Sequence, residues 1–179
     1  QTLMISKNIT LYAQWNVAMD NGHEFVDLGL SVKWATMNIG ATSPEKSGNA
    51  YAWGETYTKS SYSWDNYRHC TVRSSVSHPL TKYNSSSGYG DLDYKYVLES
   101  IDDAATVNWG ANWRMPTRNE CEELITTCTF TKTTLNGTSV YKVIGPNGHY
   151  IFLPQQDYWS SSLYSSDWAY YMSTYYSSI

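Results

Sequence analysis

The chain has 179 residues, of which 41% are hydrophobic, and a formal net charge of −4 at pH 7. This length fits one ordinary domain, or one domain with a fragment of a second. Binding to nucleic acid requires clustered Lys and Arg, and the sequence has no such cluster, so we expect no nucleic-acid partner. No apolar run reaches the length of a membrane span, so we expect no membrane insertion by this segment.

Residues 1–16 alternate between apolar and polar side chains, for example at Ile9, Thr10, Leu11 and Tyr12, which predicts a single strand. One strand is too short to be a domain, so we expect it to close a domain that begins earlier in a longer protein. Residues 17–22 are predicted to be a linker that ends in the turn dipeptide Asn21-Gly22. The second domain is then expected to cover residues 23–179.

The first half of the second domain contains few regular elements. Short strands are predicted at residues 25–30 and 32–36, on either side of a break near Gly29. Residues 40–68 are rich in Gly, Ser, Tyr and Trp and show no helical period, and residues 84–88 have the composition of a loop. Residues 91–103 have room for one or two helical turns. We therefore expect long structured loops here.

The clearest helix is predicted at residues 117–128, directly after Pro116. Thr117 is a candidate N-cap and Glu120 follows three residues later, which is the pattern of a capping box. Four side chains then share one face of the helix, as expected for burial: Cys121, Leu124, Ile125 and Cys128. Arg114, just before the helix, is expected to reach a carboxylate or a carbonyl at this corner of the fold.

Three more strands are predicted after the helix, at residues 130–134, 140–144 and 150–153. They are separated by Asn136-Gly137 and by Pro146-Asn147-Gly148, which both favour hairpin turns. Many short antiparallel strands with one clear helix and long loops indicate an α+β fold, and not a repeated βαβ fold.

The side chains that could take part in catalysis or metal binding do not form a recognisable active site. The His residues are scattered, at positions 23, 69, 78 and 149, and match no metalloprotease motif. Asp102 and Asp103 lack the calcium-loop pattern and fit a helix start or a turn better. The cysteines, at positions 70, 121 and 128, allow one disulfide with one free thiol or three buried thiols, and the second arrangement is favoured. We therefore expect no metal, no cofactor and no enzymatic activity.

The last 22 residues, 158–179, have the most distinctive composition. They contain six Tyr, two Trp and eight Ser but no Lys, Arg, Glu or His. This is the composition of an antibody-like binding surface, in which rings supply contact area and hydroxyls adapt to the ligand. Trp159 and Ala169 are expected to point inward. We predict one binding face formed by the following residues: Tyr164, Ser165, Ser166, Asp167, Trp168, Tyr170, Tyr171, Tyr175 and Tyr176.

A series of short motifs lies along the second domain. In chain order the motifs are Phe25-Val26-Asp27-Leu28-Gly29-Leu30, Lys33-Trp34-Ala35-Thr36, Asn38-Ile39-Gly40-Ala41, Tyr51-Ala52-Trp53-Gly54-Glu55, Asp103-Ala104-Ala105, Asn108-Trp109-Gly110, Trp113-Arg114-Met115-Pro116-Thr117, Ile151-Phe152-Leu153-Pro154 and Tyr158-Trp159-Ser160-Ser161-Ser162. Over roughly residues 22–162 this series resembles the Fibrobacter succinogenes major paralogous domain family of Bacteroides-type gut bacteria. Residues 7–15 are similar to the closing strand of a Listeria–Bacteroides repeat, a small β-grasp-like module of surface proteins.

This resemblance implies a C-type-lectin-like fold, held by Trp34, Trp53, Trp109 and Trp113 and by the helix from Thr117. It also implies an extracellular location on a bacterial surface and a protein or glycan ligand. Some relatives of this fold are variable proteins of diversity-generating retroelements, and the stretch from 158 onward is similar to their variable region. The calcium-binding sugar motifs of true C-type lectins are absent. Two alternatives remain open: a structural spacer, and an enzyme related to the formylglycine-generating proteins.

Overall fold

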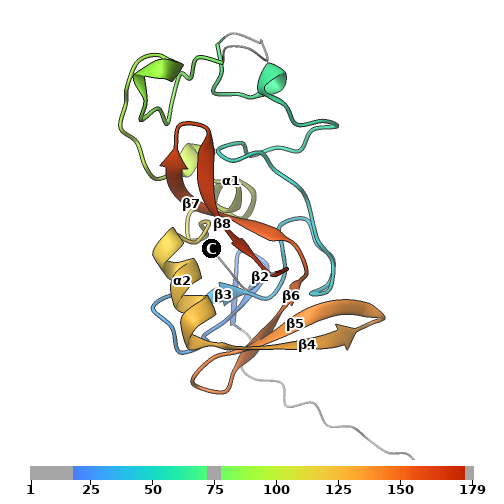
Figure 1. Cartoon of the computed structure of the whole chain (residues 1–179). Helices are drawn as coiled ribbons and strands as arrows, with labels where there is room; N and C mark the ends of the chain where they lie inside the picture. The colour runs from blue at the N-terminus through green and yellow to red at the C-terminus, as the bar shows by residue number, and fades with distance from the viewer. Residues whose placement is uncertain (1–17, 72–77, 176–179) are drawn as a thin grey trace, which may run out of the picture.

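The computed structural model describes residues 18–71 and 78–175. Within these ranges the chain forms three small antiparallel sheets and two α-helices, so the predicted α+β class is confirmed. Figure 1 shows the second sheet at one end of the molecule and the loop-rich middle of the chain at the other, with the last hairpin running between them. The strand predicted at residues 1–16 and Tyr176 lie outside the described residues.

The first sheet is formed by β1 (Ala18–Asp20), β2 (His23–Val26) and β3 (Trp34–Ala35). The predicted linker at residues 17–22 is wrong, because β1 lies inside it and pairs with β2. Asn21 and Gly22 make the tight turn between these strands, with φ angles of 47° and 81° that suit this dipeptide.

The strand predicted at residues 25–30 ends earlier than expected, at Val26. The Asp27 side chain accepts a hydrogen bond from the Gly29 amide at 2.8 Å, and Gly29 has a φ of 77°. Such a local turn competes with strand pairing. The chain therefore leaves the sheet at Asp27, and β3 is only two residues long.

The predicted helix is confirmed as α2 (Arg118–Thr127), with Thr117 as its N-cap and Glu120 completing the capping box. Cys121 and Leu124 are buried on its inner face. They pack in a core that draws on the first two sheets, α2 and the last hairpin. The buried members of this core are Val26, Leu28, Cys121, Leu124, Val143, Ile151, Leu153 and Met172.

The second sheet is formed by β4 (Thr129–Leu135), β5 (Thr138–Ile144) and β6 (Tyr150–Pro154), in that order. This matches the three strands predicted after the helix. The β4–β5 turn is made by Asn136 and Gly137, with φ angles of 48° and 81°. The turn residues in the sequence predicted both hairpins, and tertiary packing did not change this local preference.

The long segment between β3 and α2 contains short helical turns separated by structured loops. These are the 3-10 helices η1 (Trp64–Asn66), η2 (Ser87–Tyr89) and η3 (Ser100–Asp102), followed by α1 (Ala104–Trp109). Asp103 is the N-cap of α1, since its side chain accepts hydrogen bonds from the Ala105 and Thr106 amides. Asp103 thus has one of the two roles expected for it, a helix start. Asp102 has neither, because it ends η3 and is buried.

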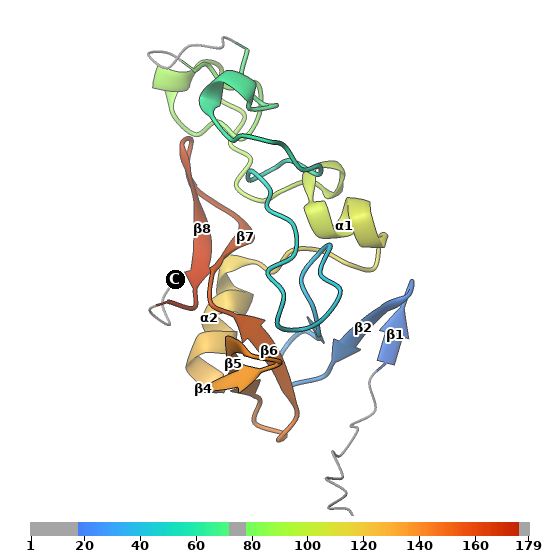
Figure 2. The same ribbon diagram turned by 90° about the vertical axis from the view of Figure 1, so that its right-hand side faces the viewer.

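The last hairpin, β7 (Asp157–Ser165) and β8 (Trp168–Ser173), connects two hydrophobic cores. Met172 belongs to the core under α2, whereas Leu163 and Ala169 pack in a second core with Trp53 and two residues of the long loop. Figure 2 shows the hairpin between α2 and the loop region. Its position is thus fixed at both ends by buried apolar side chains.

Candidate functional site

The predicted binding residues from Tyr164 to Tyr171 lie on the β7–β8 hairpin, but they do not form a single face. Tyr175 follows β8, two residues beyond its end at Ser173. Tyr170 and Tyr171 are neighbours on β8, and successive residues of a strand point to opposite sides. Tyr170 accordingly contacts Tyr164, whereas Tyr171 contacts Trp159. The prediction of one continuous face is wrong for this pair, and the hairpin presents two groups of rings.

The first group consists of Tyr164 and Tyr170, joined by Arg118 from the first turn of α2. The two Tyr rings meet edge to face with centroids 5.2 Å apart. The guanidinium carbon of Arg118 lies 4.4 Å from the Tyr170 ring centroid, and its Nη1 donates to the Tyr170 hydroxyl at 3.3 Å. Tyr164 is 64% exposed. Sequence reasoning missed Arg118, because 52 residues separate it from Tyr170.

The second group consists of Tyr171 and Trp159, which face each other across the hairpin with ring centroids 5.9 Å apart. Trp159 was expected to point inward, but it is 38% exposed and its indole donates to the Tyr51 carbonyl at 3.1 Å. Ala169 is buried as expected. The extra residues of β7 between Trp159 and Leu163 form an irregularity in the pairing. Such a bulge redirects side chains, which sequence alternation does not reveal.

The tip of the hairpin carries polar residues and the exposed Trp168. The side chain of Asp167 accepts hydrogen bonds from the hydroxyls of Ser165 at 2.8 Å and Tyr89 at 3.0 Å. Ser166, which was predicted to contact the ligand, is instead buried. Its hydroxyl accepts from the Ser85 amide at 2.9 Å, so Ser166 joins the tip to the loop beneath it. Its predicted role in direct contact is therefore not supported by its position.

Main-chain contacts hold β7 against the rest of the molecule. The Leu98 amide donates to the Ser161 carbonyl at 2.9 Å, and the Leu163 amide donates to the Tyr96 carbonyl at 2.8 Å. The indole of Trp53 donates to the Ser160 carbonyl at 2.8 Å in the buried interior. A hairpin fixed in this way presents its exposed rings with little freedom to rearrange.

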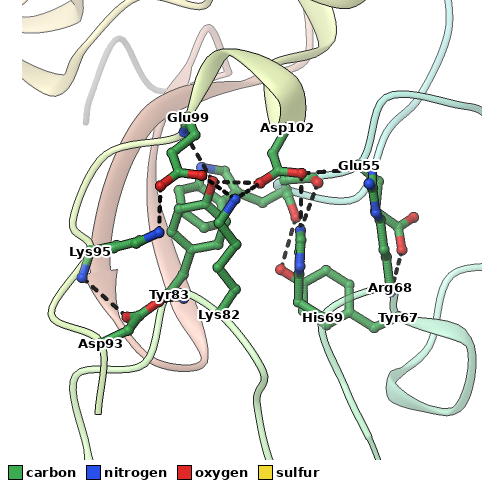
Figure 3. A network of polar contacts seen from close by, with 12 residues as sticks. Glu55, Tyr67, Arg68, His69, Lys82, Tyr83, Asp93, Lys95, Glu99 and Asp102 are labelled. Carbon is green, nitrogen blue, oxygen red and sulfur yellow. Dashed lines mark hydrogen bonds and ion pairs between the residues drawn. The ribbon is translucent and has the colours of Figure 1, made fainter.

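A buried polar network lies next to the second core (Figure 3). Asp102, only 1% exposed, accepts hydrogen bonds from Lys82 and from the Tyr83 hydroxyl, the latter at 2.7 Å. Burial disfavours its charged form, but these donors and the nearby His69 keep the pKa of Asp102 below its ordinary value. Burial also lowers the pKa of His69, against opposing effects of the Gly54 carbonyl and Asp102. The network connects four separate stretches of loop.

A cleft of about 710 Å³ lies on the side of the hairpin that carries Trp159. Aromatic side chains contribute to its walls, among them Trp34, Tyr51, Trp113 and Trp159. Glu120 also lines it, but its carboxylate is already occupied by a two-point contact with Arg114. Arg114 thus reaches a carboxylate, as its position before the helix predicted.

Cys121 is buried, whereas Cys70 and Cys128 are half-buried, so the favoured arrangement of three buried thiols is wrong for these two. No disulfide joins any of the three, all of which are described. Burial raises the pKa of Cys121 to about 12, which keeps its thiol protonated at neutral pH. Burial likewise raises the pKa of Cys128. Neither side chain is therefore suited to act as a nucleophile.

The described residues include neither a metal-binding group nor a membrane-spanning helix. Across residues 18–71 and 78–175, no group of three or more His, Cys, Asp or Glu side chains could hold a metal ion. None of the helices in that part of the chain is long and apolar enough to cross a membrane.

Comparison with known proteins found no matching protein family, no matching curated protein and no matching solved structure. The function must therefore be argued from the hairpin and its surroundings.

Proposed function

We propose that this chain is a ligand-binding module on the surface of a gut-type bacterium and that the β7–β8 hairpin carries its binding site. The observation that supports this most strongly is the exposure of large rings on a fixed hairpin. On the hairpin Tyr164 and Trp168 are 64% and 61% exposed, and Tyr175, just after β8, is 55% exposed. Tyr and Trp are enriched among the residues that dominate binding energy at interfaces. A rigid hairpin also lowers the entropy cost of binding.

The extracellular bacterial location and the C-type-lectin-like fold are proposed from the family resemblance described above. The structure is compatible with that fold in its antiparallel hairpins, its capped helix and its long ordered loops. Trp53 and Trp109, which belong to the shared motifs, are buried as scaffold residues should be. The finer proposal, that a retroelement diversifies the hairpin, rests on its composition and on the same resemblance.

Two other functions compete with this proposal. A structural spacer would not need large exposed rings grouped on one hairpin. An enzyme related to the formylglycine-generating proteins would need a reactive thiol, and the raised pKa of Cys121 argues against one there. The ligand-binding proposal therefore accounts for more of the molecule than either alternative.

The test is binding of the whole chain to an array of glycans and bacterial and host surface proteins. The variant Tyr164→Ala/Trp168→Ala/Tyr171→Ala/Tyr175→Ala should lose binding by at least roughly tenfold, since it removes the exposed rings. Tyr57→Ala/Tyr94→Ala removes equally exposed rings elsewhere and should bind as the wild type does.

Circular dichroism must show that both variants fold. Binding that survives in the hairpin variant would move the site away from β7–β8. If the folded wild type binds nothing on the array, the spacer function is favoured over this proposal.

A further inference from the structure

We propose that Arg118, Tyr170 and Tyr164 form a docking surface for a protein partner that presents an Asp or Glu carboxylate beside apolar side chains. This inference rests on the proposed function, because it assigns a partner chemistry to one side of the same hairpin. It adds Arg118 of α2 to the site, and it assigns the acidic partner to the side of the hairpin that carries Tyr164 and Tyr170.

The charge of Arg118 is available to a partner. Five other cations form ion pairs with carboxylates: Lys59, Arg68, Lys82, Lys95 and Arg114. Arg118 forms no ion pair with any residue of the described part of the chain, and its guanidinium contacts the ring and the hydroxyl of Tyr170. One of its five N–H donors points to the Tyr170 hydroxyl, so donors remain for a ligand.

The position of Arg118 is also unfavourable for the helix that carries it. It is the first residue of α2, where the helix dipole favours anions and disfavours a cation. Contact with the face of the Tyr170 ring offsets part of this cost. The backbone amide of Arg118 is already bonded to the Ser162 hydroxyl at 3.1 Å. An anion would therefore be bound by the guanidinium, and not by the end of the helix.

The surroundings of Arg118 favour a protein partner over a small molecule. Sites for small molecules are concave, and Arg118, Tyr164 and Tyr170 line neither the cleft beside Trp159 nor a smaller one lined by His23 and Trp109. Protein interfaces instead concentrate their binding energy in Tyr, Trp and Arg. An Arg beside two Tyr rings can take a carboxylate in a two-point contact while the rings cover apolar surface. Charge complementarity thus requires an acidic partner here.

The test uses a phage-displayed random peptide library selected separately on the whole wild-type chain and on Arg118→Glu. We expect the wild type to enrich peptides with Asp or Glu next to aromatic or aliphatic residues, and Arg118→Glu to enrich Lys or Arg instead. A peptide selected on the wild type should bind Arg118→Gln at least roughly tenfold more weakly. The matched control is Lys142→Gln, because Lys142 also lies over a Tyr ring, 3.9 Å from the centroid of Tyr150, on a different sheet.

Each other outcome contradicts the inference. The role of Arg118 would be overturned if both selections enriched the same sequences. It would also be overturned if Lys142→Gln weakened peptide binding as much as Arg118→Gln does. Binding that needs Arg118 but is found only for acidic glycans would overturn the protein partner. If Tyr164→Ala abolishes peptide binding while Arg118→Gln does not, the proposed function stands and this inference fails. If neither matters, this inference fails, and the proposed function is decided by the four-ring hairpin variant.

Discussion

The Glu120 carboxylate accepts hydrogen bonds from two neighbours at the start of α2, Thr117 and Arg114. Its carboxylate accepts the Thr117 amide at 2.7 Å and makes a two-point contact with Arg114, while Thr117 in turn caps the helix. The hydrogen bond from Arg114, opposed by burial and supported by Thr117, lowers the pKa of Glu120 to about 2. The charged form of this side chain is therefore stabilised in the folded protein.

This lowered pKa predicts a pH dependence of stability. The folded value of about 2 lies below the ordinary value of 4.5, so the contribution of Glu120 is complete above pH 4.5 and is lost as the pH falls toward 2. Glu120→Gln mimics the protonated form. Its stability deficit against the wild type, measured by urea unfolding, should be largest near about pH 6 and shrink by about pH 3.

Glu122→Gln provides the control, because the carboxylate of Glu122 forms no ion pair with the residues that the structure describes. A deficit of Glu120→Gln that stays constant from about pH 6 to about pH 3 would contradict the assigned role of the Arg114 contact.

At the scale of elements, sequence reasoning succeeded where the signals are local. The capping box at Thr117 and the turn at Asn136-Gly137 place α2 and the β4–β5 hairpin correctly. It failed where partners are distant in the chain. The Trp53 indole bonds to Ser160 across 107 residues, and Arg118 reaches Tyr170 across 52. No periodicity or turn signal encodes such contacts.

The hairpin itself shows a mixed outcome. Its composition correctly indicated exposed rings at Tyr164 and Trp168, but it did not separate binding residues from structural ones. Ser160 and Ser166 are buried, because their hydroxyls satisfy polar groups in the interior. A serine gives the same sequence signal in both roles. The strand alternation at Tyr170 and Tyr171, in contrast, could have been used to predict two faces.

Ser166→Ala tests the structural role of the hairpin tip. The substitution removes the acceptor of the Ser85 amide and the donor to the Asn84 side chain. Loss of this partner at a half-buried amide should lower the free energy of unfolding by roughly 0.5–1.5 kcal/mol, measured in urea. Ser165→Ala is the matched control, since its partner Asp167 is exposed and water can replace the lost hydroxyl.

Equal stability of the two serine variants would show that the tip is not anchored through Ser166. Faster amide exchange at Ser85 in Ser166→Ala, but not in Ser165→Ala, would confirm that this contact joins the tip to the loop.

At the scale of the whole molecule, the loop-rich segment must be ordered without much regular secondary structure. Its stretches are connected through Asp102, which Lys82, Tyr83, Arg68 and His69 approach from different parts of the loop (Figure 3). Tyr83 also belongs to the second core, on which the hairpin packs. The network and that core therefore stabilise the loop and the hairpin together.

Asp102→Asn should consequently disturb more than its own surroundings. The variant keeps the size of the side chain but leaves Lys82 without its buried counterion, which we expect to cost about 3 kcal/mol of unfolding free energy. Because the loop carries the carbonyl that binds the Leu163 amide, exchange at Leu163 and at Leu98 should accelerate together.

Glu99→Gln is the matched control: Glu99 pairs with the same Lys82 but is exposed, so its loss should matter much less. If Asp102→Asn and Glu99→Gln have equal unfolding midpoints and leave exchange at Leu163 unchanged, the network contributes nothing to the position of the hairpin, which its apolar contacts and main-chain hydrogen bonds then hold without it.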